Sequence, residues 1–232
     1  KKYGFDTVEK GGLNVITTLD LKLQEAAEEI VLRNVNRNTE LYKGKNGAMF
    51  VEDPKTGEIL AMVGSKNYFD TENEGNFNVA MQGLRQPGSA MKPFIYLTAF
   101  QKGFSPETVI FDVPTEFSAN EPTCPLININ FSKEEDSPAP GIKKCFHPQN
   151  FDERFRGPVK IRTALAQSIN ILAVKTLYLA GIDAVLKTAK DFGISTLTER
   201  SRYGLSLVLG GGEVTLKDLV GAYSVFAQEG IK

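Results

Sequence analysis

The chain has 232 residues, of which 41% are hydrophobic and 24% are charged, and its formal net charge at pH 7 is -1. This composition is typical of a globular protein with a real core. The sequence contains no basic block of the kind that neutralises phosphates, so we predict no nucleic-acid partner. No apolar run is long enough for a membrane span or a signal sequence, so we expect any membrane anchor to lie outside this chain.

The first predicted elements are a linker and an amphipathic helix. Residues 1–19 are expected to form a linker strand region. Asp20 then suits a helix N-cap, and apolar residues follow it at helical spacing. These residues are Leu23, Ala26, Ala27, Ile30 and Val31. We therefore expect one helix that starts after Asp20 and buries one face.

A hairpin is predicted at residues 48–63. Two apolar runs, 49–51 and 59–63, flank Asp53-Pro54 and Gly57, which are typical turn residues. The polar stretch 67–78 that follows predicts a loop.

The next segment contains Ser89 and Lys92, a nucleophile and a nitrogen base in the pattern Ser-x-x-Lys. Pro87-Gly88 breaks the preceding structure, and residues 94–100 form an apolar helical run. Residues three apart on a helix share a face, so we expect the Lys92 amine to reach the Ser89 hydroxyl. The helix start would also favour a developing negative charge there. The alternative is a helix N-cap followed by a solvated lysine.

Residues 117–149 are predicted to form a long irregular insertion, because the stretch is rich in proline and polar residues. Its two cysteines, Cys124 and Cys145, are the only ones in the chain. Two distant thiols do not suggest a metal site. An oxidising compartment would permit a disulfide, but the sequence leaves open whether the two meet in space.

Helices are expected at residues 159–179, 182–192 and 215–228. Within the first of them, Ser168 and Asn170 interrupt an otherwise apolar stretch. Buried hydroxyl and amide groups are costly unless they are paired, so these two either cap a local helix end or line a polar cavity. Ser118-Ala119-Asn120 has the same pattern within a loop composition, and we do not regard it as a motif.

Ser-x-x-Lys at Ser89 and Lys92, followed by Ser-x-Asn at Ser168 and Asn170, gives two of the three motifs of penicillin-binding proteins and class A β-lactamases. The chain resembles the transpeptidase domain of a class A penicillin-binding protein, over nearly its whole length. The similar stretches are residues 11–20, 52–64, 86–94, 150–152 and 204–211.

The resemblance implies an α+β fold, the serine β-lactamase and penicillin-binding-protein transpeptidase fold. It would be the N-terminal part: a helix, a hairpin and then a helical subdomain, with an incomplete sheet. The third family motif, Lys-Thr-Gly, does not follow Asn170. Lys55-Thr56-Gly57 spells it, but it precedes the nucleophile and lies in the predicted turn. We therefore expect residues 20–232 to be the N-terminal portion of a longer transpeptidase domain, which would need its C-terminal remainder.

The resemblance also implies a mechanism without a metal or cofactor. Ser89 would attack the penultimate D-Ala carbonyl of a peptidoglycan stem peptide, Lys92 would take its proton, Ser168 would relay a proton to the leaving amine, and Asn170 would hold a substrate amide. The single histidine, His147, falls in the predicted loop and is expected to be structural or exposed. Lysine can serve as the base if burial lowers its pKa.

The implied location is extracytoplasmic, with an N-terminal membrane anchor and a glycosyltransferase domain before this segment. The implied partners are stem peptides on lipid-linked glycan strands, and β-lactams. We expect this chain alone to be nearly inactive, because the family's second oxyanion donor lies on the strand that carries the third motif.

Three alternatives remain open. A serine β-lactamase or β-lactam sensor shares the serine and lysine chemistry, and rapid deacylation would identify the lactamase. A class B penicillin-binding protein is more similar to this chain than a β-lactamase or sensor is, although the flanks of Ser89 and Ser168 favour class A. The third is a non-catalytic fragment that acts as a scaffold in a wall-synthesis complex.

Overall fold

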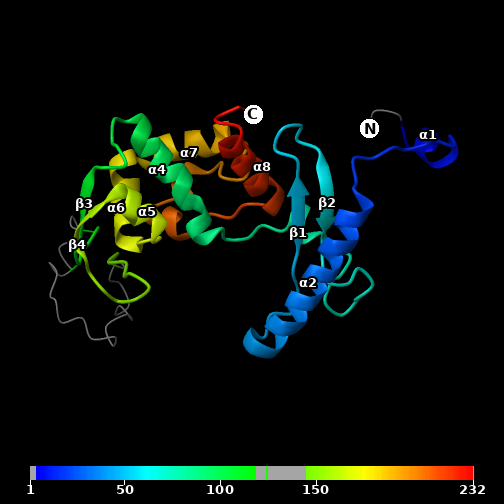
Figure 1. Ribbon diagram of the computed structural model, residues 1–232, viewed down its shortest axis with the longest axis horizontal. Helices are drawn as coiled ribbons and strands as arrows, with labels where there is room; N and C mark the ends of the chain where they lie inside the picture. The colour runs from blue at the N-terminus through cyan, green and yellow to red at the C-terminus, as the bar shows by residue number, and fades with distance from the viewer. Residues whose placement is uncertain (1–3, 119–123, 125–144, 232) are drawn as a thin grey trace. The chain divides into compact units, whose positions relative to one another are not determined.

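The computed structural model describes residues 4–118, 124 and 145–231 (Figure 1). The described part is α+β, with helices and two two-stranded sheets, so the predicted fold class is confirmed. The chain divides into two compact units, residues 1–83 with 215–232, and residues 84–214. The domain boundary expected at Asp20 stays a prediction.

The first unit begins with two helices. Helix α1 (Phe5–Lys10) buries no residue and carries an ion pair between Lys10 and Asp6, with 3.4 Å between Nζ and Oδ1. The described residues 4–19 contain no strand, so the expected strand is wrong there. Residues 5–10 form a short helix instead, which the spacing of Asp6 and Lys10 favours. Helix α2 (Leu21–Tyr42) starts as predicted, because Asp20 Oδ1 accepts a hydrogen bond of 3.1 Å from the Leu23 N–H.

The predicted hairpin is confirmed as strands β1 (Met49–Glu52) and β2 (Ile59–Val63), which pair antiparallel. The Asp53 N–H donates to the Glu58 carbonyl at 2.9 Å and closes the turn. Lys55-Thr56-Gly57 lies in this turn, as the sequence predicted. Figure 1 shows α2 running beside the hairpin.

The core of the first unit forms where α2 packs on β2. Side chains four residues apart on α2 share one face and meet the inward residues of the strand. The buried residues are Ala27, Val31 and Val35 on the helix, with Ala61 and Val63 on the strand. The periodicity of the sequence therefore predicted Ala27 and Val31 correctly, and Leu23 packs partly buried against them. Ala26 and Ile30, which it placed on the same face, are exposed.

Two further helices complete the first unit. Helix α8 (Leu216–Ala227) is capped by Thr215 and packs against β1 and against helix α3 (Val79–Gln82). The sequence predicted α8. It did not predict α3, because four residues are too few to show a helical period.

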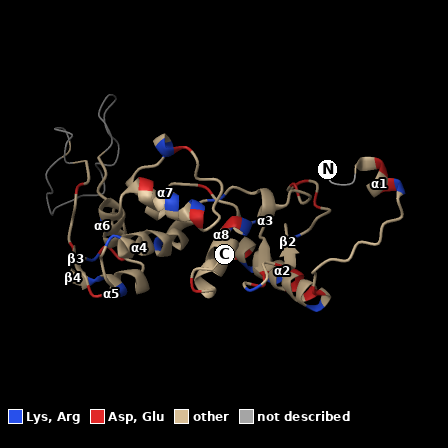
Figure 2. Cartoon of the chain, turned by 90° about the horizontal axis from the view of Figure 1, so that it is seen from above, with Lys and Arg blue, Asp and Glu red and all other residues tan. Residues whose placement is uncertain are grey.

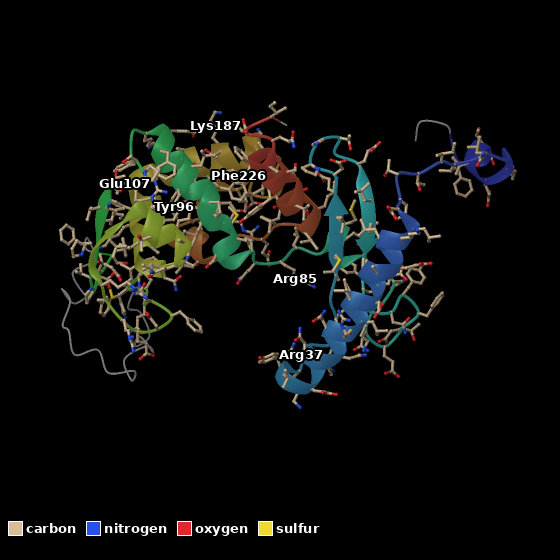
Figure 3. The ribbon with its side chains drawn as sticks, in the orientation of Figure 1. Arg37, Arg85, Tyr96, Glu107, Lys187 and Phe226 are labelled. Atoms are coloured by element: carbon tan, nitrogen blue, oxygen red, sulfur yellow. A yellow bond between two sulfur atoms is a disulfide. The ribbon has the colours of Figure 1, made fainter. Side chains whose placement is uncertain are left out.

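The second unit is built around helix α4 (Lys92–Gln101), which packs against α6 (Asn170–Ala180) and α7 (Ile182–Asp191). Its residues Phe94, Ile95 and Tyr96 have no exposed surface, and Figure 3 shows Tyr96 among the surrounding helices. A helix that is buried on nearly all sides is a core helix.

The second unit also contains a small antiparallel sheet that the sequence did not predict. Strand β3 (Val109–Asp112) pairs with β4 (Gly157–Lys160), and β4 leads directly into the short helix α5 (Ile161–Ala166). The single helix expected at residues 159–179 is therefore wrong: the segment forms the end of β4, then α5, a break, and α6. Helix α7 agrees with its prediction.

Most of the predicted insertion at residues 117–149 lies outside the described residues, including Ala119 and Asn120. Cys124 and Cys145 are joined by a disulfide, with their Cα atoms 5.5 Å apart. The described part ends with the short helices η2 (Arg200–Arg202) and η3 (Leu205–Leu209), followed by α8.

Charged side chains of both signs are interspersed along α7, as Figure 2 shows, and no basic stripe is visible there. Among the described residues, no helix has the length and apolar content that crossing a membrane requires.

Candidate active site

Ser89 lies in a single 3-10 turn, η1 (Gly88–Met91), which leads directly into α4. The Lys92 N–H donates to the Ser89 carbonyl, and Pro93 falls in the first turn of α4, where its missing N–H costs no intrahelical bond. The α-helix itself therefore starts three residues later than expected. Ser89 is exposed, while Met91 and Lys92 are buried.

Two glycines hold the Ser89 turn in place. Gly88 has φ +56° and Gly210 has φ +100°, a region that suits glycine. A Cβ on Gly210 would lie 2.8 Å from the Gly88 nitrogen. The backbone at position 210 therefore approaches this turn so closely that only glycine fits. The turn packs against η3.

Lys92 is the buried cation of this site, with only 1% of its surface exposed. Its Nζ donates to the Ser168 carbonyl at 2.7 Å, to Ser168 Oγ at 3.0 Å and to Asn170 Oδ1 at 2.8 Å. These contacts use all three N–H groups of the ammonium. Burial lowers the pKa of Lys92 to about 8, because the charged form loses its hydration.

The structure brings together Lys92, Ser168 and Asn170, but it differs from our expectation for Ser89. Among the hydrogen bonds of the described residues, none joins Lys92 Nζ to Ser89 Oγ. The physical reason is that the three protons of the amine are already bound by residues 168 and 170. A neutral amine would donate only two bonds, and its lone pair could then accept the proton of a neighbouring hydroxyl.

Ser168 occupies the break between α5 and α6. It has φ +54°, its N–H donates to Leu165 O, and the Ile169 N–H donates to Ala164 O. This is a Schellman motif, in which the left-handed position usually belongs to glycine. A serine there carries a strained backbone, and such strain is typical of functional sites.

The strained backbone gives a testable prediction for two substitutions of Ser168. Ser168→Ala keeps the strain and removes the hydroxyl, whereas Ser168→Gly also relieves the strain. We expect Ser168→Gly to be more stable than Ser168→Ala by about 1 kcal/mol in urea unfolding, since the left-handed conformation costs a non-glycine residue roughly that amount. Equal stabilities would contradict the interpretation of Ser168 as a residue held against its backbone preference.

Asn170 is the first residue of α6 and bridges two elements. Its Oδ1 accepts from Lys92, and its Nδ2 donates to the Gln149 carbonyl at 3.2 Å. One partner only donates and the other only accepts, so this network fixes the orientation of the amide.

His147 lies next to Glu116. Its Nδ1 lies 3.1 Å from Glu116 Oε2, in the loop that leads from Cys145 to Asn150. Sequence analysis missed the contributions of Asn150 and Asp112, which lie behind Asn170. The only sequence signal for Asn150 was the family resemblance at residues 150–152, and none of the similar stretches includes Asp112. No group of three potential metal ligands occurs among the described residues.

A separate pocket of about 610 Å³ lies within the first unit. It is lined by α2, the end of β2 and residues 64–78, and its wall includes the exposed rings of Tyr68 and Phe69. None of the four predicted site residues lines it.

Comparisons with known proteins indicate one family. The family described as "Penicillin binding protein transpeptidase domain" matches residues 47–133, which include Ser89 and Lys92. Penicillin-binding protein 2D of Bacillus subtilis is 34% identical over all of this chain, and penicillin-binding protein 1A of Aquifex aeolicus is 38% identical over 82% of it. The chain spans only 30% and 22% of the lengths of these two relatives.

Solved structures of penicillin-binding proteins are also similar to this chain. Penicillin-binding protein 1A from Haemophilus influenzae is 32% identical, with a TM-score of 0.60 over 78% of this chain and 23% of that one. The fold alone is also shared with PonA1 from Mycobacterium tuberculosis, which is 23% identical and has a TM-score of 0.72 over 99% of this chain and 54% of that one. The chain therefore belongs to the penicillin-binding protein transpeptidase family.

Proposed function

We propose that this chain is part of a serine-type peptidoglycan D,D-transpeptidase that β-lactams acylate at Ser89. One observation carries the proposal: a buried lysine with a pKa of about 8 lies one turn after an exposed serine and contacts Ser168 and Asn170. A lysine can act as a base near neutral pH only with such a lowered pKa. Family membership supports the same activity.

The acylation step follows from these groups. Ser89 Oγ attacks the carbonyl carbon of the penultimate D-Ala, and its proton passes to the neutral Lys92 amine. The tetrahedral intermediate then collapses, the C–N bond breaks, and the terminal D-Ala leaves with a proton delivered through Ser168. An amine of a second stem peptide attacks the acyl-enzyme and releases Ser89. With a β-lactam, the same attack opens the ring, and the amine stays attached to the acyl group.

The substrate and location belong to the same proposal. We expect the acyl donor to be a stem peptide on a lipid-linked glycan strand, outside the cytoplasm, in a protein anchored to the membrane. A solved structure of PonA1 from Mycobacterium tuberculosis is a complex with penicillin V, which supports β-lactam binding by this fold. The Cys124–Cys145 disulfide suits an oxidising compartment.

Labelling with a fluorescent penicillin, followed by mass mapping of the adduct, tests the proposal. It should be done on this chain alone and on the full-length protein. We expect a long-lived adduct on Ser89 in the full-length protein and little or none on the chain alone. A label that is rapidly lost by hydrolysis would indicate a β-lactamase, and no adduct in either sample would leave the scaffold interpretation.

A further inference from the structure

A buried carboxylate lies behind the Ser-x-Asn segment. Asp112, at the end of β3, has no exposed surface, and Asn150 is 4% exposed. Asn150 Nδ2 donates to both oxygens of Asp112, at 2.8 and 3.1 Å. The Arg156 N–H donates to Asp112 Oδ2 at 3.1 Å, and the Arg156 guanidinium lies 3.4 Å from the same oxygen. The buried charge is therefore paired and hydrogen-bonded, as stability requires.

The other end of the Asn150 amide reaches the start of α6. Asn150 Oδ1 accepts from the Ile171 N–H at 3.1 Å. The helix has no cap of its own, because its N-cap residue Ile169 makes no side-chain bond. Asn150 thus satisfies one of the unpaired N–H groups from a distant part of the chain. The amide has one orientation only, since Asp112 accepts and Ile171 donates.

The same loop holds the neighbouring residue of the helix. The Gln149 carbonyl accepts from Asn170 Nδ2, so two consecutive loop residues bind two consecutive residues of α6. Asn170 in turn places its Oδ1 2.8 Å from Lys92 Nζ. A continuous chain of hydrogen bonds runs from Asp112 through Asn150 to the helix start that carries Asn170.

We propose that Asp112 and Asn150 are positioning residues, which fix the start of α6 so that Asn170 Oδ1 meets Lys92 Nζ. Neither side chain contacts the reacting atoms. They act by setting where α6 begins, and the consequence for Ser89 acylation rests on the function proposed above. The placement of Asn170 against Lys92 does not depend on that function.

The decisive variant is Asn150→Ala, which removes the cap. It leaves unchanged the charges of Asp112, of Arg156 and of Lys175, whose Nζ donates to the neighbouring Phe111 carbonyl at 2.7 Å. NMR of lysine labelled with ¹³C at Cε in this chain reports the titration of Lys92. We expect Asn150→Ala to lower the Lys92 pKa by about 1, since the ammonium loses an acceptor. Asn170→Ala, which removes that acceptor directly, sets the full size of the change.

A matched control separates positioning from general loss of stability. Thr188 is 5% exposed on α7 and its Oγ1 lies 2.8 Å from Thr98 Oγ1, in the same unit. Thr188→Val should lower the unfolding midpoint without moving the Lys92 pKa. If Asn170→Ala moves that pKa and Asn150→Ala does not, the positioning role is overturned.

The full-length protein provides a second readout. Asn150→Ala and the milder, isosteric Asp112→Asn should each slow acylation of Ser89 by about 10- to 100-fold, because a small misplacement of a site residue has effects of that size. Unchanged acylation in both variants would overturn the role in the reaction. If the unmodified protein is not acylated at all, the proposed function fails, and the Lys92 titration still decides the positioning.

Discussion

Replacing Ser89 by alanine should abolish labelling of the full-length protein by a fluorescent penicillin, with a loss of acylation rate on the order of 10⁶-fold. Ser89 is the exposed hydroxyl one turn before the buried Lys92, so we expect it to form the acyl bond. The substitution removes a surface hydroxyl, so the unfolding midpoint should hardly change. Gel fluorescence and intact-mass measurement both report the labelling.

Ser105→Ala is a suitable control for this experiment. Ser105 is also exposed, in the turn after α4, and its hydroxyl lies 3.4 Å from Thr108 Oγ1. This variant should be labelled as fast as the unmodified protein. An adduct that persists in Ser89→Ala, for example on Ser168, would show that Ser89 is not the nucleophile.

Lys92→Met should slow acylation by about 10²- to 10⁴-fold, the usual contribution of a general base. The substitution should also remove the pH dependence of the acylation rate. With a pKa of about 8, Lys92 is neutral in roughly one molecule in ten at pH 7 and one in a hundred at pH 6. The unmodified full-length protein should therefore react about ten times faster at pH 7 than at pH 6, and the rate should level off above pH 8. A chromogenic β-lactam measured from pH 6 to 9.5 tests both statements.

The same substitution should stabilise the fold at neutral pH. Below pH 8, Lys92 is charged in both states, and its burial costs the folded state about 3 kcal/mol relative to an ordinary lysine with a pKa of 10.5. Between pH 8 and 10.5 the unfolded state binds more protons, so this cost falls as the pH rises. After allowing for lost hydrogen bonds, we expect Lys92→Met to gain about 1–2 kcal/mol at pH 7.

Urea unfolding of this chain at pH 7 and at pH 9.5 measures that effect. The stability difference between Lys92→Met and the unmodified chain should be larger at pH 7 than at pH 9.5. A Lys92→Met variant that is less stable than the unmodified chain at pH 7 would indicate that the three hydrogen bonds of the ammonium outweigh its desolvation.

Local sequence patterns determined the elements whose stability is local. The start of α2 follows from Asp20 and the helical spacing of apolar residues, and the hairpin follows from turn residues between two apolar runs. Ser89 and Lys92 were identified by their spacing, and Ser168 and Asn170 by being polar within an apolar stretch. At the start of α2 and in the hairpin, a few neighbouring residues decide the backbone conformation.

Only the tertiary structure decided how these residues combine. The β3–β4 pairing joins four-residue strands from distant segments, and the break at Ser168 depends on a strained residue that periodicity cannot reveal. The sequence predicted that Lys92 would reach Ser89, whereas packing of α4 on α6 directs its amine to Ser168 and Asn170 instead. The lowered pKa of Lys92 and the Asp112–Asn150 support both come from burial among segments far apart in the chain, a property that no local pattern contains.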